Sequence, residues 1–194
     1  MKKAILLIAS LIMVFFSGRA DACVGKSLHI GVLNSAEGQV LSEILSTLIT
    51  ERTGTTVAVE YYKNIQELYD AVQAKKVDVT IENTARAMQL LKQPVEADPK
   101  KAYEYVKTAY EKERGMIWLK PFGFSRSTGV ASPSYTATIL RVDILSSFPV
   151  LPRVINKLGS AIDDEAYAKL IKSAEGGEKP KKVARDFLKA KKLI

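Results

Sequence analysis

Histidine and cysteine are nearly absent from this chain: among its 194 residues, His29 and Cys23 are the sole examples of their kinds. A single cysteine cannot form an intrachain disulfide, even in an oxidising compartment. The same scarcity excludes Cys–His pairs, Ser–His–Asp triads, zinc cages and haem ligation. We therefore expect no metal or other cofactor, and an enzyme built on this chain would have to use carboxylates, lysine or tyrosine.

Long hydrophobic runs are limited to the start of the chain. Two lysines precede the nearly unbroken apolar run of residues 4–16, and Ala20-Asp21-Ala22 then gives an Ala-x-Ala pattern. This order is typical of a secretory signal peptide over residues 1–22, and it predicts a periplasmic protein. The alternative is an uncleaved anchor, which is disfavoured because the run is short for a stable membrane span.

Cleavage after Ala22 would leave Cys23 as the first mature residue, which raises the question of a lipid anchor. A lipobox normally has a large aliphatic residue three positions before the cysteine and small residues between. This chain has Ala20 at the first of those positions and Asp21 at the next. Ordinary cleavage is therefore favoured over lipid attachment, and residues 23–194 suit one domain.

Basic residues exceed acidic ones, and the formal net charge is +8. Many of the basic residues lie in the segment 179–192, within a predicted amphipathic helix. On an exported protein such charge points to an anionic membrane surface or partner and not to nucleic acid. A solvated helix face is the simpler explanation and the favoured one.

Hydrophobic patterns predict a regular alternation of strands and helices. Strands are expected at 28–33, 56–62 and 77–81, with helices at 37–53, at 64–75 and from 84 onward. Such alternation implies right-handed crossovers and a mostly parallel sheet with helices on both faces, which is an α/β fold. Later segments predict a helix from 98, strands at 116–119, 128–134 and 135–142, and short helices near 150–158, 163–171 and 180–191.

Several strings along the chain match a known family. They are Gly25-Lys26-x-Leu28-x-Ile30-Gly31, Tyr69-x-Ala71-Val72-x-Ala74-x-x-Val77-Asp78-Val79-x-x-Glu82-Asn83-Thr84, Trp118-Leu119-x-Pro121-x-Gly123-Phe124 and Asp143-x-Leu145-x-x-Phe148-Pro149. With these motifs the chain resembles the glycine betaine/choline (osmoprotectant) class of periplasmic solute-binding proteins. The resemblance implies a type II periplasmic-binding-protein fold, a small zwitterionic or quaternary-amine solute, an ABC permease as partner and no enzymatic activity.

The chain departs from that family in having no room for a second lobe. The second lobe is normally inserted between the Gly-Phe element and the Asp-x-Leu segment, but here Phe124 and Asp143 are only about twenty residues apart. Closure of a hinge around a ligand needs two bodies. The sequence therefore predicts a single three-layer lobe, which could pair with another copy in a homodimer or with a membrane partner.

A second departure concerns the aromatic residues that hold quaternary ammonium groups by cation–π contacts. In the family an aromatic residue often follows the acid of the Glu-x-Thr motif, where this chain has Asn83. Rings could come instead from neighbouring loops, or they could pack in the core. The residues concerned are Tyr61, Tyr62, Trp118, Phe122 and Phe124.

Ligands of an open parallel sheet bind outside the carboxyl ends of its strands. The residues predicted to bind the solute there are Asn34, Ser35, Glu37, Tyr62, Glu82, Asn83 and Thr84, joined from later in the chain by Trp118, Phe124 and Arg126. Helix N-termini favour a carboxylate, whereas the two glutamates could face a cationic group.

A structural role stays open for several of these residues, because Ser, Asn and Thr are good helix caps. For Asn83 and Thr84 capping and ligand contact are equally plausible, and for Asn64 capping is favoured. Arg126 either pairs with a ligand carboxylate or is a solvated loop charge.

Three functions follow from the sequence. The first is a solute receptor reduced to one lobe. The second is an exported structural or interaction protein that kept the lobe and lost the ligand. The third, an enzyme that uses Glu37 and Glu82, is the least favoured.

Overall fold

The computed structural model describes residues 27–125 and 134–194. The predicted signal peptide, Cys23, Arg126 and nearly all of the strand predicted at 128–134 lie outside the described residues. Among the helices that the structure describes, none combines the length and the apolar character that a membrane crossing requires.

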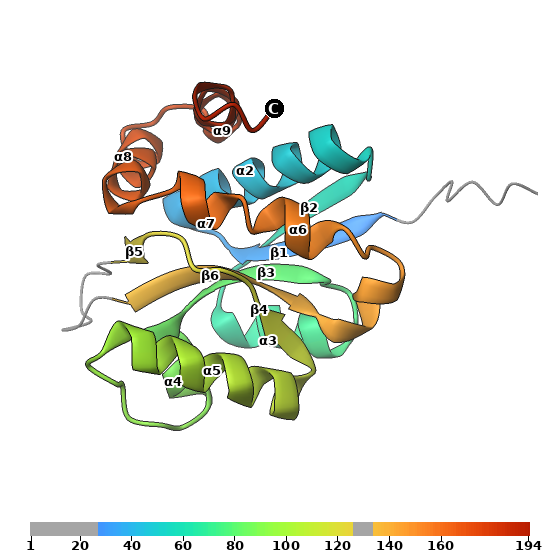
Figure 1. Cartoon of the computed structure of the whole chain (residues 1–194), viewed down its shortest axis with the longest axis vertical. Coiled ribbons are helices and arrows are strands. Elements are labelled where there is room, and N and C mark those ends of the chain that lie inside the picture. Colours follow the sequence, from blue (N-terminus) through green and yellow to red (C-terminus); the bar gives the residue numbers. More distant parts are fainter. Residues whose placement is uncertain (1–26, 126–133) are drawn as a thin grey trace, which may run out of the picture.

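One mixed sheet forms the centre of the lobe, with the strand order β2-β1-β3-β6-β4 (Figure 1). β1 pairs in parallel with β2 and β3, whereas β6 is antiparallel to β3, β4 and the short β5. β2, β1, β3 and β4 therefore run in one direction, which confirms the mostly parallel α/β sheet. The strand bounds are β1 Leu28–Leu33, β2 Val57–Tyr62, β3 Val79–Asn83, β4 Met116–Trp118, β5 Phe124–Ser125 and β6 Ser134–Arg141.

Helices cover both faces of the sheet, as predicted (Figure 1). One layer comprises α3 (Ile65–Gln73), α4 (Thr84–Leu90) and α5 (Pro99–Arg114), and the other comprises α2 (Ala36–Thr53), α6 (Leu151–Ile155), α7 (Leu158–Ala161), α8 (Asp164–Glu175) and α9 (Pro180–Ala190). A 3-10 turn, η1 (Val142–Ser146), follows β6. A helix was predicted over 150–158; the structure divides that region into α6 and α7, and between them Asn156 accepts a hydrogen bond from the Lys120 N–H at 2.8 Å.

Two hydrophobic clusters, one on each side of the sheet, make up the core. The first joins β1 and β3 to α2 and α6–α9, and Leu48 and Leu188 are fully buried in it. The second joins β4 and β6 to α3–α5 around Tyr110 and Trp118. A fully buried leucine contributes about 1.5–3 kcal/mol relative to an exposed one, so both layers are held to the sheet by apolar burial.

The chain enters α2 through a tight turn at the end of β1. Ser35 caps the helix by accepting a hydrogen bond from the Gly38 N–H at 3.0 Å. A Cβ atom on Gly38 would lie within 3.0 Å of the Leu33 carbonyl oxygen, so only glycine lets the first helical turn lie so close to the strand end. Asn64 caps α3 in the same way, as predicted.

β3 begins and ends two residues later than the predicted strand at 77–81. Asp78 precedes the strand and accepts a hydrogen bond from the His29 N–H at 2.9 Å. The antiparallel register with β6 continues to the pair Asn83 and Thr136. Glu82 and Asn83 are consequently held in the sheet itself and not in a loop.

Candidate functional site

Four of the predicted residues meet at the carboxyl ends of β1 and β3. Ser35, Glu37, Glu82 and Asn83 line one cavity of about 30 Å³. Arg86 and Thr136 also line it, although neither was predicted. A cavity of this size holds one or two water molecules, so it is a wall or a corner for a solute and not an enclosing pocket.

Both carboxylate oxygens of Glu82 accept hydrogen bonds at this edge of the sheet. Its side chain is buried, and its oxygens accept hydrogen bonds from the Asn83 N–H at 2.8 Å, from the Tyr69 hydroxyl at 3.0 Å and from Arg86 Nε. The Tyr69 and Tyr110 hydroxyls lie 2.9 Å apart. Since a buried carboxylate is tolerated only when paired and hydrogen-bonded, this network is what allows Glu82 to stand beneath the site.

Arg86 provides the positive charge of the site from the first turn of α4. Burial opposes the charge, but the neighbouring Glu82, aided by Glu37, raises the pKa of the guanidinium above its usual value. The side chain remains 30% exposed. The guanidinium can therefore reach a bound carboxylate while Nε bonds Glu82.

Glu37 is held from the other side by α8. The Tyr167 hydroxyl donates to Glu37, and it also lies 3.2 Å from the Thr136 hydroxyl. The Tyr167 ring lies over Gly123, where the absence of a Cβ atom makes room for it. The cavity thus contains two carboxylates that accept hydrogen bonds from tyrosines of α3 and α8, and one guanidinium that donates to Glu82.

Helix capping accounts for part of the predicted set. The Asn83 side chain accepts from the Arg86 N–H at 2.8 Å and caps α4, as Ser35 caps α2. Thr84 is buried and its hydroxyl accepts from the Tyr135 N–H at 3.2 Å. Asn34 is exposed and accepts from the Gln39 side chain. Ser35 and Asn83 both cap a helix and line the cavity, whereas Asn34 and Thr84 lie beside it.

Trp118 and Tyr62 do not line this cavity. Trp118 is 3% exposed and packs edge-on against Tyr110 at 5.5 Å, because α5 covers the end of the sheet where β4 lies. It belongs to the core cluster of α3–α5 and does not line this cavity. The Tyr62 hydroxyl donates to Glu60 at 2.7 Å, and burial together with Glu60 raises the pKa of Tyr62 to about 12. Phe124 lies in β5, opposite Tyr135 in the register.

Arg86, Thr136 and Tyr167 were missed by sequence reasoning. Arg86 carried a usable signal, since it stands in the first turn of a predicted helix, only four residues after the carboxylate of Glu82. Thr136 and Tyr167 carried none. Their positions depend on the register of β6 and on the return of α8 to the strand ends.

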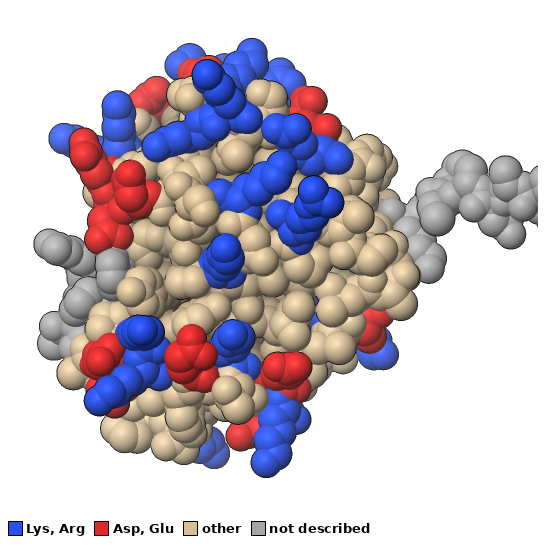
Figure 2. Space-filling model, viewed as in Figure 1, with Lys and Arg blue, Asp and Glu red and all other residues tan. Residues whose placement is uncertain are grey.

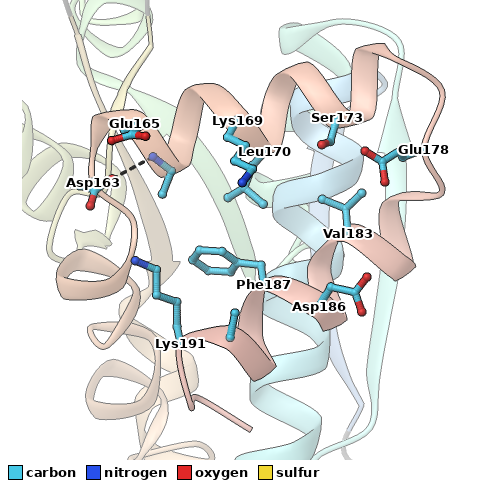
Figure 3. Close-up of a pocket in the computed structure, with 12 residues that line it drawn as sticks. Asp163, Glu165, Lys169, Leu170, Ser173, Glu178, Val183, Asp186, Phe187 and Lys191 are labelled. Carbon is cyan, nitrogen blue, oxygen red and sulfur yellow. Dashed lines mark hydrogen bonds between the residues drawn. The ribbon is translucent and has the colours of Figure 1, made fainter.

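Two larger hollows lie elsewhere and share no residue with this cavity. One, of about 630 Å³, lies among α3, α5 and η1 and contains Arg114 and Asp143. The other, of about 570 Å³, lies between α8 and α9, where Leu170, Val183 and Phe187 face the space (Figure 3). Within the described ranges, no group of His, Cys, Asp and Glu side chains is arranged to hold a metal ion.

Comparison with known proteins gives one family match. Residues 26–139, more than half of the chain, match the model of a family described as the substrate-binding domain of an ABC-type glycine betaine transport system. No curated protein sequence is a significant match.

Solved structures agree on the fold. A glycine betaine/carnitine/choline ABC transporter structure has a TM-score of 0.77 at 15% identity, covering 88% of this chain and 99% of that chain. Apo YehZ from Escherichia coli has a TM-score of 0.75 at 13% identity, covering 88% and 100%. A lactococcal OpuAC complexed with glycine betaine has a TM-score of 0.51 at 8% identity, covering 86% and 96%.

Proposed function

Because the chain belongs to the family of substrate-binding domains of ABC-type glycine betaine transport systems, we propose that it is the periplasmic receptor of such a system and binds a small zwitterionic solute. Its partner would be an ABC permease in the inner membrane. Members of this family bind solutes and are in general not enzymes, and we propose the same for this chain.

The observation that carries the proposal is the convergence of Glu37, Glu82, Asn83 and Arg86 on one cavity at the carboxyl ends of β1 and β3. Ligands of open α/β sheets bind at this edge. The opposite charges of Arg86 and Glu37 match the two ends of a zwitterion, with the guanidinium facing the carboxylate and Glu37 facing the ammonium group.

The lobe supplies one wall of the binding site in this proposal. A cavity of about 30 Å³ cannot enclose a solute. The opposite wall would come from a second copy of the chain or from the permease, since a ligand that stays half exposed gains little from burial.

A second candidate is an exported interaction protein that has lost the solute. Among the described residues that line the cavity, none is aromatic. Moreover, Glu82 and Arg86 already satisfy each other. Cation–π capture of a quaternary ammonium group would require rings that these lining residues do not supply.

Titration calorimetry and thermal-shift measurements with glycine betaine, carnitine, choline and amino acids would test the proposal. We expect a zwitterion to bind and choline, which has no carboxylate, to bind at least tenfold more weakly because it cannot pair with Arg86. At a hundredfold excess over Kd a ligand stabilises the folded state by about 2.7 kcal/mol, which a thermal shift detects.

Matched variants test whether the solute binds at this cavity. Glu37→Gln and Arg86→Gln should abolish the shift, whereas Glu51→Gln and Arg153→Gln, which change exposed residues away from the cavity, should preserve it. A folded protein that responds to none of these solutes would favour the interaction role instead.

A further inference from the structure

α9 and the residues around it present a dense group of cations, which we call the basic face. It comprises Lys179, Lys181, Lys182, Arg185, Lys189, Lys191 and Lys192, all of them exposed. Asp186 is the one acidic residue between 179 and 192. In Figure 2, Lys and Arg side chains spread over the upper part of the molecule, where Figure 1 shows α9, α2 and α6, and acidic side chains lie toward the edges of that area.

Most of this charge is uncompensated. Lys182 pairs with Asp186 at 3.0 Å, and Arg185 pairs with Glu51 at 3.3 Å. Within residues 27–125 and 134–194, no carboxylate forms an ion pair with the other five lysines. A solvated helix that merely keeps a protein soluble usually interleaves both signs, so the excess of one sign on this helix indicates an anionic partner.

A well-packed helix holds most of these cations outward, whereas Lys191 lines the hollow between α8 and α9 (Figure 3). Val183, Ala184 and Leu188 of α9 are buried in the same core cluster as α2. The end of the chain is fixed as well, since Arg52 donates to the Leu193 carbonyl oxygen. Because Val183, Ala184 and Leu188 are buried in the core, the exposed side of α9 presents its charges to a surface.

Lysine predominates over arginine on this face. Arginine recognises single carboxylates through a fixed bidentate fork, whereas the lysine ammonium is a hydrated point charge without that directionality. A row of lysines therefore suits a surface whose negative charges are mobile and dense, such as lipid headgroups, better than it suits a fixed set of protein carboxylates. We propose that the basic face docks the protein on an anionic phospholipid surface.

Docking in this way leaves the candidate solute site accessible. The polar contacts that α9 and the residues after it make with α2 involve Glu51 and Arg52, in the last turn of α2. The solute site lies at the opposite end of α2, at Ser35 and Glu37. At a rise of 1.5 Å per residue the two ends are roughly 20 Å apart. A membrane-bound protein could thus still exchange solute.

Vesicle sedimentation tests the proposal with purified protein. One set of vesicles contains phosphatidylcholine alone, and the other contains phosphatidylcholine mixed with phosphatidylglycerol. We expect binding only to the anionic vesicles, and a fall in binding as salt is raised, since exposed charges are screened. Each basic residue near an anionic leaflet strengthens binding roughly fivefold.

A matched pair of triple variants separates the effect of the basic face on vesicle binding from the effect of the protein's net charge. Lys181→Gln/Lys189→Gln/Lys192→Gln should weaken binding to the anionic vesicles by on the order of a hundredfold. Lys100→Gln/Lys101→Gln/Lys112→Gln changes exposed lysines of α5, on the other layer, by the same total charge and should have a much smaller effect. Equal melting temperatures would confirm that both variants fold.

Two outcomes would overturn the proposal. One is an equal loss of binding in the two triple variants, which would reduce the effect to overall charge. The other is binding of the wild-type protein to soluble polyglutamate without binding to anionic vesicles, which would assign the face to an acidic protein. Solute binding, measured separately by calorimetry, is unaffected by either result.

Discussion

The hydroxyls of Tyr69 and Tyr110 form a buried contact beneath the candidate site, and these two residues should give the stability of the fold a pH dependence. Burial, with Glu82 nearby, raises the pKa of both hydroxyls above the ordinary 10.0. The folded state therefore keeps protons that the unfolded state releases as pH rises above 10. By proton linkage the free energy of unfolding must fall with rising pH in that range.

We predict that alkaline destabilisation depends on these two tyrosines. Each retained proton contributes a slope of about 1.4 kcal/mol per pH unit to the free energy of unfolding. Tyr69→Phe should remove one such slope, and Tyr105→Phe, at a position 44% exposed, should remove none. Denaturant unfolding at a series of pH values above 10 measures both. Identical slopes in wild type and Tyr69→Phe would contradict the prediction.

The roles of single residues could be predicted best where their interaction partners are close in sequence. Ser35, Asn64 and Asn83 cap helices, and each could be predicted because the capping oxygen and the N–H that it accepts from are three residues apart. Trp118 shows the opposite case. Its side chain suits a ligand box and a core equally well, and only the position of α5 decides between the two.

Single elements are positioned by contacts that the sequence does not display. Where α8 approaches the solute site, Tyr167 packs over Gly123, which has a φ of 67°. A Cβ atom at Gly123 would lie within 3.0 Å of three Tyr167 atoms. This contact is long-range in sequence, and no periodicity of either segment could have indicated it.

Gly123→Ala should therefore destabilise the fold by more than its backbone conformation alone explains. Gly54 provides the reference, because its φ is 69° and an added Cβ meets nothing within 4 Å. A left-handed alanine costs roughly 1–2 kcal/mol, so Gly54→Ala should lose about that amount, and Gly123→Ala should lose about 1–3 kcal/mol more from the displaced ring. Denaturant unfolding of the two variants measures the difference. Equal losses would show that the Tyr167 contact is not needed.

The strands and helices, like the single residues, could be predicted where the determining interactions are local in sequence and could not where they are long-range. The strand–helix alternation of residues 28–90 was predicted correctly because apolar periodicity and capping act within a few residues. The direction of β6 was not predicted, since pairing with β3 is a property of the folded sheet. That direction matters, because it brings Thr136 beside Asn83 and so completes the candidate site.

At the scale of the whole molecule, the α/β class and the single lobe could be predicted, whereas two of the residues at the site, Thr136 and Tyr167, could not. Ser35, Glu37, Glu82 and Asn83 follow from the rule that strand ends converge. Arg86 was within reach because it stands in the first turn of a predicted helix, four residues after Glu82. Thr136 and Tyr167 required the full topology, because they come from the second half of the chain and join the site across the sheet edge.

The two helical layers share one sheet, so we predict that they unfold together. Trp118 is the single tryptophan and is buried in the layer of α3–α5, so its fluorescence reports on that layer. Far-UV circular dichroism reports on all the helices. Leu48→Ala empties a core position in the other layer and should lower stability by about 2–5 kcal/mol. Because both helical layers pack against the same sheet, the fluorescence and circular dichroism signals should both shift to the same lower denaturant midpoint. If the circular dichroism moved while the fluorescence midpoint stayed in place, the layers would be independent folding units and the lobe would not be one cooperative domain.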